Sequence, residues 1–129
     1  MQRNSKYNAK KTIFKGIKFD SQKEAQRYGE LLLMEKGKLI TNIKLQPKYE
    51  LQEKYRKNGK GIRAICYIAD FEYLDLKTNK LVIEDVKSDY TRKNPLYKVK
   101  KKMFEYKYKE LEIKEIIWAI LKKNIYQKI

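Results

Sequence analysis

The 129-residue chain contains 32 Lys and Arg against 16 Asp and Glu, and a net charge of +16 favours a polyanionic partner, above all nucleic acid. It has no histidine and one cysteine, which excludes an internal disulfide, Ser-His-Asp and Cys-His triads, and zinc sites built from His and Cys. Any catalysis must therefore use carboxylates, lysines and a hard metal ion with oxygen ligands.

Residues 1–11 are polar and basic, and we expect them to form a flexible arm ahead of a single domain over residues 12–129. The beginning of the chain lacks the apolar core of a signal peptide. No apolar run approaches the ~20 residues that span a bilayer. We therefore expect a cytoplasmic protein without a membrane partner.

The next segments predict a short hairpin and then a helix. Residues 12–20 alternate around Lys15-Gly16, which is typical of a hairpin turn. Ser21 is a good N-cap, Glu24 is the partner expected in a capping box, and Gly37 is a natural helix terminator. The residues expected to face the core are Ala25, Tyr28, Leu31 and Leu32.

The middle of the chain predicts extended segments and one hairpin. Residues 39–52 are interrupted at Gln46-Pro47, because proline breaks a strand ladder. Residues 53–63 form a predicted basic loop, and residues 64–74 and 81–87 form two strands joined near Lys77-Thr78-Asn79. The basic residues of the predicted loop are Lys54, Arg56, Lys57, Lys60 and Arg63.

The C-terminal part predicts a second helix and a further strand. Asn94 is a helix cap and Pro95 suits the first helical position. Residues 113–121 are expected to be a strand. Helical spacing places Leu96, Val99, Met103 and Tyr106 on one apolar face, with Lys98, Lys101, Lys102 and Lys109 largely off it. Strands interleaved with two helices predict an α/β or α+β domain with a mixed sheet.

Two carboxylates and one lysine are candidates for chemistry on the predicted hairpin. Asp85 and Lys87 share one face of their strand, because side chains alternate. If the hairpin turns on Lys77-Thr78, Asp70 lies directly opposite Asp85, whereas a bulge at Asn79 would shift the register by one residue. Two such carboxylates suit Mg²⁺, with Mn²⁺ as a substitute, and the lysine could orient or deprotonate an attacking water.

These residues resemble a known family. Ala69-Asp70, followed after 14 residues by Asp85-Val86-Lys87, resembles the motif of PD-(D/E)XK nucleases, with alanine in place of the motif's proline. The segments FDSQKEAQRY, LQPKYEL, YIADFEY and EDVKS are similar to small phage-encoded members and to transposon endonuclease subunits. The resemblance covers residues 14–116, and implies a restriction-endonuclease-like core, a phage DNA-processing role and a location in the host cytoplasm.

The resemblance also implies residue roles. Asp70 and Asp85 would bind the metal with the Val86 carbonyl, and Lys87 would be the catalytic lysine. Glu24 would bind the metal directly or through water. The further implied residues are Gln46 lining the site and Lys100 approaching the phosphate.

Several alternatives remain open from the sequence. Glu24 could serve only as a helix cap, Gln46 could only satisfy a buried backbone group, and Asp85 and Lys87 could be a solvent-exposed ion pair. Glu72 and Glu84 are expected to pair with surface lysines, with Glu84 pointing away from Asp85.

The predicted function is a Mg²⁺-dependent endodeoxyribonuclease with structure-selective or weak sequence preference, acting on double-stranded or branched DNA. Alternatives are a Holliday-junction resolvase acting as a homodimer, and a non-catalytic DNA-binding protein. RNA is not excluded as substrate. The residues expected to hold DNA are the basic loop together with Lys98, Lys101 and Lys102.

Overall fold

A computed structural model describes residues 11–117. The elements in chain order are β1 (Thr12–Phe14), β2 (Ile17–Phe19), α1 (Gln22–Lys36), β3 (Ile40–Leu45), β4 (Lys48–Gln52), β5 (Tyr55–Lys57), β6 (Lys60–Ile62), β7 (Ile65–Ile68), β8 (Phe71–Asp75), β9 (Lys80–Lys87), the 3₁₀ turn η1 (Thr91–Lys93), α2 (Pro95–Lys107) and β10 (Ile113–Ile117). Of the expected segments, residues 1–10 of the arm, residues 118–121 of the last strand and the end of the domain to residue 129 lie outside the described residues.

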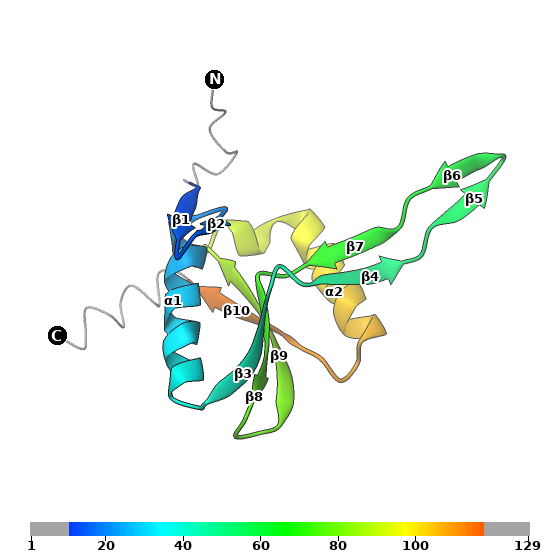
Figure 1. Cartoon of the computed structure of the whole chain (residues 1–129). Helices are drawn as coiled ribbons and strands as arrows, with labels where there is room; N and C mark the ends of the chain where they lie inside the picture. Colours follow the sequence, from blue (N-terminus) through cyan, green and yellow to red (C-terminus); the bar gives the residue numbers. More distant parts are fainter. Residues whose placement is uncertain (1–10, 118–129) are drawn as a thin grey trace.

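A four-stranded mixed sheet, ordered β10-β9-β8-β3, forms the centre of the fold, with β10 parallel to β9 and the other neighbours antiparallel. The two helices lie on opposite sides of this sheet (Figure 1). One buried cluster includes Ala25 and Leu31 of α1, and the other includes Tyr97 and Phe104 of α2. The predicted α+β fold with a mixed sheet flanked by two main helices is therefore confirmed.

The hairpin of β8 and β9 has the register expected for a turn on Lys77-Thr78. The ladder runs from Phe71 opposite Glu84 to Asp75 opposite Lys80. Asn79 adopts a left-handed conformation with φ of 58° without shifting this register. The bulge considered at Asn79 is therefore absent. The regular ladder ends at Phe71 and Glu84, and just beyond it the Asp70 N–H donates to the Glu84 carbonyl at 3.1 Å, so Asp70 lies beside the Glu84-Asp85 segment without a regular strand pairing to Asp85.

The strand predicted over residues 64–74 is in fact two strands. β7 ends at Ile68 and pairs with β4, whereas β8 begins at Phe71 and joins the central sheet. Asp70 sits at the break between them, next to the fully buried Ala69. The break leaves Asp70 at the end of a strand rather than within one.

The segment predicted as a basic loop is a hairpin of β5 and β6. Asn58 and Gly59 have φ values of 52° and 76° and form its tip. Two successive left-handed residues are the requirement of a tight type I′ turn, for which Asn-Gly is the preferred pair. The hairpin extends the β4–β7 pair away from the body of the molecule (Figure 1).

Both helices begin where the sequence predicts. The Ser21 side chain accepts a hydrogen bond from the Glu24 N–H, and Asn94 accepts from two N–H groups of α2. Gly37 ends α1, but Lys38 takes the left-handed conformation. The apolar stripe of α2 is largely exposed, because the helix packs through Tyr97 and Phe104 instead. Within residues 11–117, neither helix has the length and apolar character needed to cross a membrane.

Candidate active site

The candidate site lies at the break between β7 and β8, where Asp70 comes close to Asp85 and Lys87 of β9. Asp70 is half-buried, and its Oδ2 accepts a hydrogen bond of 2.7 Å from the Val86 N–H. Lys87 Nζ lies 3.2 Å from Asp85 Oδ1, and both side chains are largely buried. The structure thus brings the three principal predicted residues to one place.

Two tyrosines hold Asp85 and Lys87 in position. The Tyr67 hydroxyl donates to Asp85 Oδ2, which leaves Oδ1 for Lys87. Lys87 Nζ lies 4.3 Å from the centroid of the Tyr97 ring, a cation–π contact. The Tyr97 hydroxyl donates to Glu115 at 2.6 Å. Neither tyrosine was a sequence candidate, because both have the pattern of ordinary core residues.

Glu24 reaches the same group of charges from the start of α1. Burial, the most important cause, and the charge of Asp20 raise the pKa of Glu24 to about 7, with Asp85 adding to the shift. Hydrogen bonding with Asp70 and the charge of Lys87 act in the opposite direction. Glu24 therefore belongs to the electrostatic environment of the site as well as to the capping sequence.

Asp70 has the most unfavourable environment of the acids. Its pKa is raised well above the usual range by burial first, and then by the charges of Asp85 and Glu24. The hydrogen bond from the Val86 N–H lowers it only in part. Three carboxylates thus repel one another at a partly buried site.

The donor chemistry of this group fits a hard divalent cation. Carboxylates and a backbone carbonyl are ligands that Mg²⁺ accepts, and a cation would relieve the repulsion. The N–H of Val86 points toward Asp70, and in an extended strand the carbonyl of the same residue points to the same side. Within residues 11–117, however, no three His, Cys, Asp or Glu side chains are already arranged around a common metal position. Binding would therefore require Asp85 to exchange at least one of its present partners.

Glu84 and Glu72 have partners that the sequence did not predict in full. Glu84 is completely buried and accepts two hydrogen bonds from Arg27, at 2.8 and 2.7 Å, and one from the Tyr73 hydroxyl. The expectation of a surface lysine partner for Glu84 is therefore wrong. Glu72 is buried but does pair with the exposed Lys44 at 3.3 Å.

The Arg27–Glu84 ion pair connects the two elements that carry site acids. Arg27 lies one turn after Glu24 on α1, and Glu84 precedes Asp85 on β9. The pair joins residues 57 positions apart. Local sequence patterns could not have shown it, since a lone arginine in a helix is usually a surface residue.

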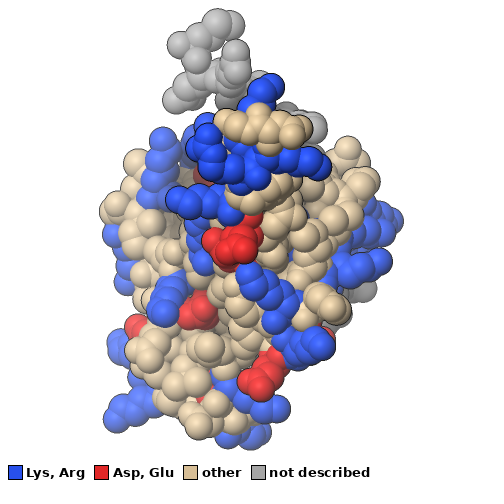
Figure 2. All heavy atoms as spheres, turned by 90° about the vertical axis from the view of Figure 1, so that its right-hand side faces the viewer, with Lys and Arg blue, Asp and Glu red and all other residues tan. Residues whose placement is uncertain are grey.

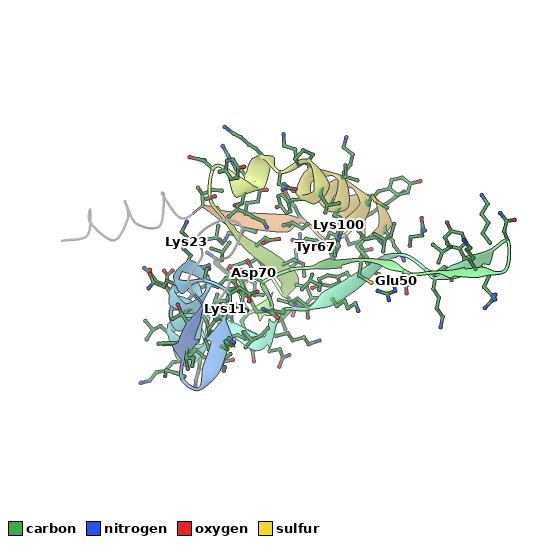
Figure 3. The ribbon with its side chains drawn as sticks, turned by 90° about the horizontal axis from the view of Figure 1, so that it is seen from above. Lys11, Lys23, Glu50, Tyr67, Asp70 and Lys100 are labelled. Atoms are coloured by element: carbon green, nitrogen blue, oxygen red, sulfur yellow. The ribbon has the colours of Figure 1, made fainter. Side chains whose placement is uncertain are left out.

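Gln46 and Lys100 were expected to line the site. The Gln46 N–H donates to the Asp70 carbonyl at 2.9 Å, but the residue is exposed and has a φ of 48°. It therefore contacts the Asp70 segment through its backbone. Lys100 is half-buried on α2, and from above Tyr67 lies between Lys100 and Asp70 (Figure 3).

The residues expected to bind DNA lie on two surfaces. Those of the predicted loop are all exposed on and beside β5 and β6. Lys98 and Lys102 are exposed on α2, whereas Lys101 is half-buried and lies 3.7 Å from Glu115. A groove of about 570 Å³ contains all three lysines together with Arg92, Lys93, Tyr97, Glu105 and Glu115. The face toward which the hairpin points carries many Lys and Arg side chains and few acidic ones (Figure 2).

Comparison with known protein families gives a match over most of the chain. Residues 4–124 match a family described as "Protein of unknown function (DUF1064)". No curated protein and no solved structure matches the chain.

Proposed function

The chain belongs to the DUF1064 family, and from the chemistry of its site we propose that it is a divalent-metal-dependent endodeoxyribonuclease of the PD-(D/E)XK type. The observation that carries the proposal is the convergence of Asp70 and Asp85 with Lys87 where the ladder of β8 and β9 ends. An acid whose pKa is raised, as that of Asp70 is, next to a second acid and a lysine is typical of functional sites rather than of ordinary sheet surfaces.

Each residue has a defined role in this proposal. Asp70, Asp85, the Val86 carbonyl and Glu24 would hold Mg²⁺ or Mn²⁺. The metal, when bound, supplies charge stabilisation on the scissile phosphate and acidifies a bound water. Lys87, fixed by Asp85 and by the Tyr97 ring, would orient the attacking water and stabilise negative charge that develops on the phosphate. The product would be a hydrolysed phosphodiester.

The second candidate is a DNA-binding protein without catalysis. It is favoured by the present partners of Asp85, whose two oxygens are engaged by Tyr67 and Lys87. In that case the acids would only fix the end of the sheet. The basic hairpin and the groove beside α2 would serve both candidates equally, so binding alone does not distinguish them.

A nicking assay separates the two. Purified protein is incubated with supercoiled plasmid and with a branched duplex, in Mg²⁺, in Mn²⁺ and in EDTA. We expect nicking in both metals and none in EDTA. Lys87→Ala and Asp85→Asn should lower the rate by about 100-fold or more. Lys80→Ala is the matched control, because Lys80 is an exposed lysine of the same strand.

The proposal fails if no condition yields nicked DNA. It also fails if the Lys87 and Asp85 variants nick as fast as the wild type, since the activity would then come from elsewhere. Retained DNA binding by both variants, together with lost nicking, would exclude misfolding as the cause of the loss.

A further inference from the structure

The hairpin of β5 and β6, here called the ribbon, contributes no residue to either buried cluster of the described structure. Every residue over 52–63 is exposed, and in the described structure β5 and β6 form a two-stranded sheet of their own. An isolated two-stranded hairpin is at best marginally stable in water. We therefore expect the ribbon to act by contacting a partner outside this chain.

The base of the ribbon is held firmly. Tyr49 and Leu51 of β4 and Tyr67 of β7 pack in the cluster that contains Phe104 of α2. The Tyr108 hydroxyl also donates to the Glu50 carbonyl at 2.9 Å. The strands from which the ribbon extends are thus anchored to the body that carries the candidate site.

The ribbon carries an excess of positive charge that would favour binding to an anion. Over residues 53–63 there are five basic residues and one acid, Glu53. Lys57 and Lys60 stand directly opposite each other at the tip, and like charges in that position destabilise a hairpin. Within residues 11–117, none of the five basic side chains forms an ion pair. A bound polyanion would offset the repulsion between these two lysines.

The shape of the ribbon restricts how it can approach DNA. Cross-strand partners share a face, so Tyr55 and Ile62 lie on the same face as the two tip lysines. On the other face Arg56 stands opposite Gly61, which has no side chain, and the ribbon is thin there. The major groove, about 12 Å wide, admits a two-stranded ribbon, whereas the minor groove, about 6 Å wide, does not.

We propose that the ribbon enters the major groove of duplex DNA and presents the face of Tyr55, Lys57, Lys60 and Ile62 to the base edges. Lysine donors suit the O6 and N7 acceptors of guanine, and apolar side chains suit the thymine methyl group. The ribbon therefore adds a preference for sequence that phosphate contacts cannot provide. The inference rests on the proposed function for its choice of duplex DNA as partner.

The length of the ribbon gives the inference a measurable scale. At about 3.3 Å per extended residue, β4 and β5 together (residues 48–57) span at most about 30 Å, which limits the distance of the tip from the break beside Asp70. That is close to one turn of B-DNA, about 34 Å. Duplex held at the candidate site must therefore extend by roughly one turn before the tip can bind it.

The test measures binding with Ca²⁺ in place of Mg²⁺, on duplexes of about 8 to about 20 base pairs, by fluorescence anisotropy. Wild-type affinity should rise with length up to about two turns. Lys57→Ala/Lys60→Ala should lose about 10-fold on the longest duplex, keep its affinity for the shortest, and show a salt slope smaller by about 1 to 2. The matched control is Lys77→Ala/Lys80→Ala, two exposed lysines at the tip of the β8–β9 hairpin.

Two chemical probes identify the groove. Methylation of guanine N7, a major-groove atom, should weaken wild-type binding to the long duplex and have little effect on the tip variant. Netropsin, which occupies the minor groove, should leave the wild-type affinity unchanged. Equal affinity of wild type and tip variant on the long duplex would overturn the inference, as would competition by netropsin without interference by N7 methylation.

The remaining outcomes are also decisive. If the wild type forms a dimer by sedimentation and the tip variant does not, the ribbon is an interface between copies of this chain and the inference is wrong. Length-dependent binding without nicking in Mg²⁺ or Mn²⁺ overturns the nuclease proposal alone. Nicking without length-dependent binding overturns only the role of the ribbon.

Discussion

Removing one partner of the buried ion pair between Arg27 and Glu84 is expected to destabilise the packing of α1 on the sheet. Replacing Arg27 by methionine preserves the length of the side chain but removes both hydrogen bonds to Glu84, at 2.8 and 2.7 Å. Glu84 is 0% exposed, so water cannot replace them. Only the Tyr73 hydroxyl would still donate to it.

The expected loss is about 3–5 kcal/mol, because breaking a buried pair leaves an uncompensated charge. Removing both charges should cost much less. The triple variant Arg27→Met/Glu84→Met/Tyr73→Phe leaves neither an unpaired charge nor a hydroxyl without an acceptor. It should recover at least about half of the loss, since well-packed apolar residues often replace a buried ion pair with little change in stability. Glu30, the other partner of Arg27, is one-third exposed and can be solvated.

Urea denaturation followed by circular dichroism measures these differences. With a slope of about 2 kcal/mol/M, Arg27→Met should lower the midpoint by on the order of 2 M. Arg92→Ala is the control, because Arg92 pairs with Asp89 on the surface and its loss should cost less than about 1 kcal/mol. The reasoning is refuted if Arg27→Met is no more harmful than this control, or if the triple variant is no more stable than Arg27→Met.

Two further predictions concern the candidate site. The pKa of Glu24 is raised to about 7 from 4.5, so the folded chain keeps a proton that the unfolded chain releases, and the stability that this proton provides is lost as the pH rises through about 7. Without divalent metal, the melting temperature of Glu24→Gln should therefore fall less from pH 5 to pH 8 than that of the wild type, and equal slopes would contradict the raised pKa. Tyr97→Leu should lower the nicking rate about fivefold, since a cation–π contact contributes about 1 kcal/mol to holding Lys87. Tyr97→Phe keeps the ring and should nick within about twofold of the wild type; equal losses in both variants would assign the effect to the Glu115 hydrogen bond instead.

Local features of the fold could be predicted because their causes are local. The caps at Ser21 and Asn94 and the turn after Asp75 each depend on a few neighbouring residues. The register of the β8–β9 hairpin, which brings Asp70 close to Asp85, followed from the position of the turn. The ribbon could also have been predicted, because Asn58-Gly59 is a strong hairpin signal. The surrounding basic residues suggested a loop instead.

Features that depend on tertiary contacts could not be predicted. The periodicity of α2 gives an apolar face, yet the helix packs through Tyr97 and Phe104, whose rings meet Tyr67 from the β4–β7 pair. Helical spacing defines the period of a pattern but does not decide which of two apolar stripes is buried. The break between β7 and β8 also depends on tertiary contacts. The sequence shows one extended run, but not that its two halves pair with strands of two different sheets.

The contrast between Glu84 and Asp70 is the best argument that the site acids serve more than the fold. Glu84 is fully buried on β9, and Asp70 is half-buried just before the neighbouring β8. A carboxylate removed from water normally needs a cation. Glu84 has the guanidinium of Arg27, whereas Asp70 forms no ion pair within residues 11–117, although the chain contains 32 Lys and Arg. Asp70 has instead two acids as neighbours, which raise its pKa further. The fold therefore supplies a buried arginine for Glu84 but no cation for Asp70. The proposed metal would supply that missing positive charge from outside the chain.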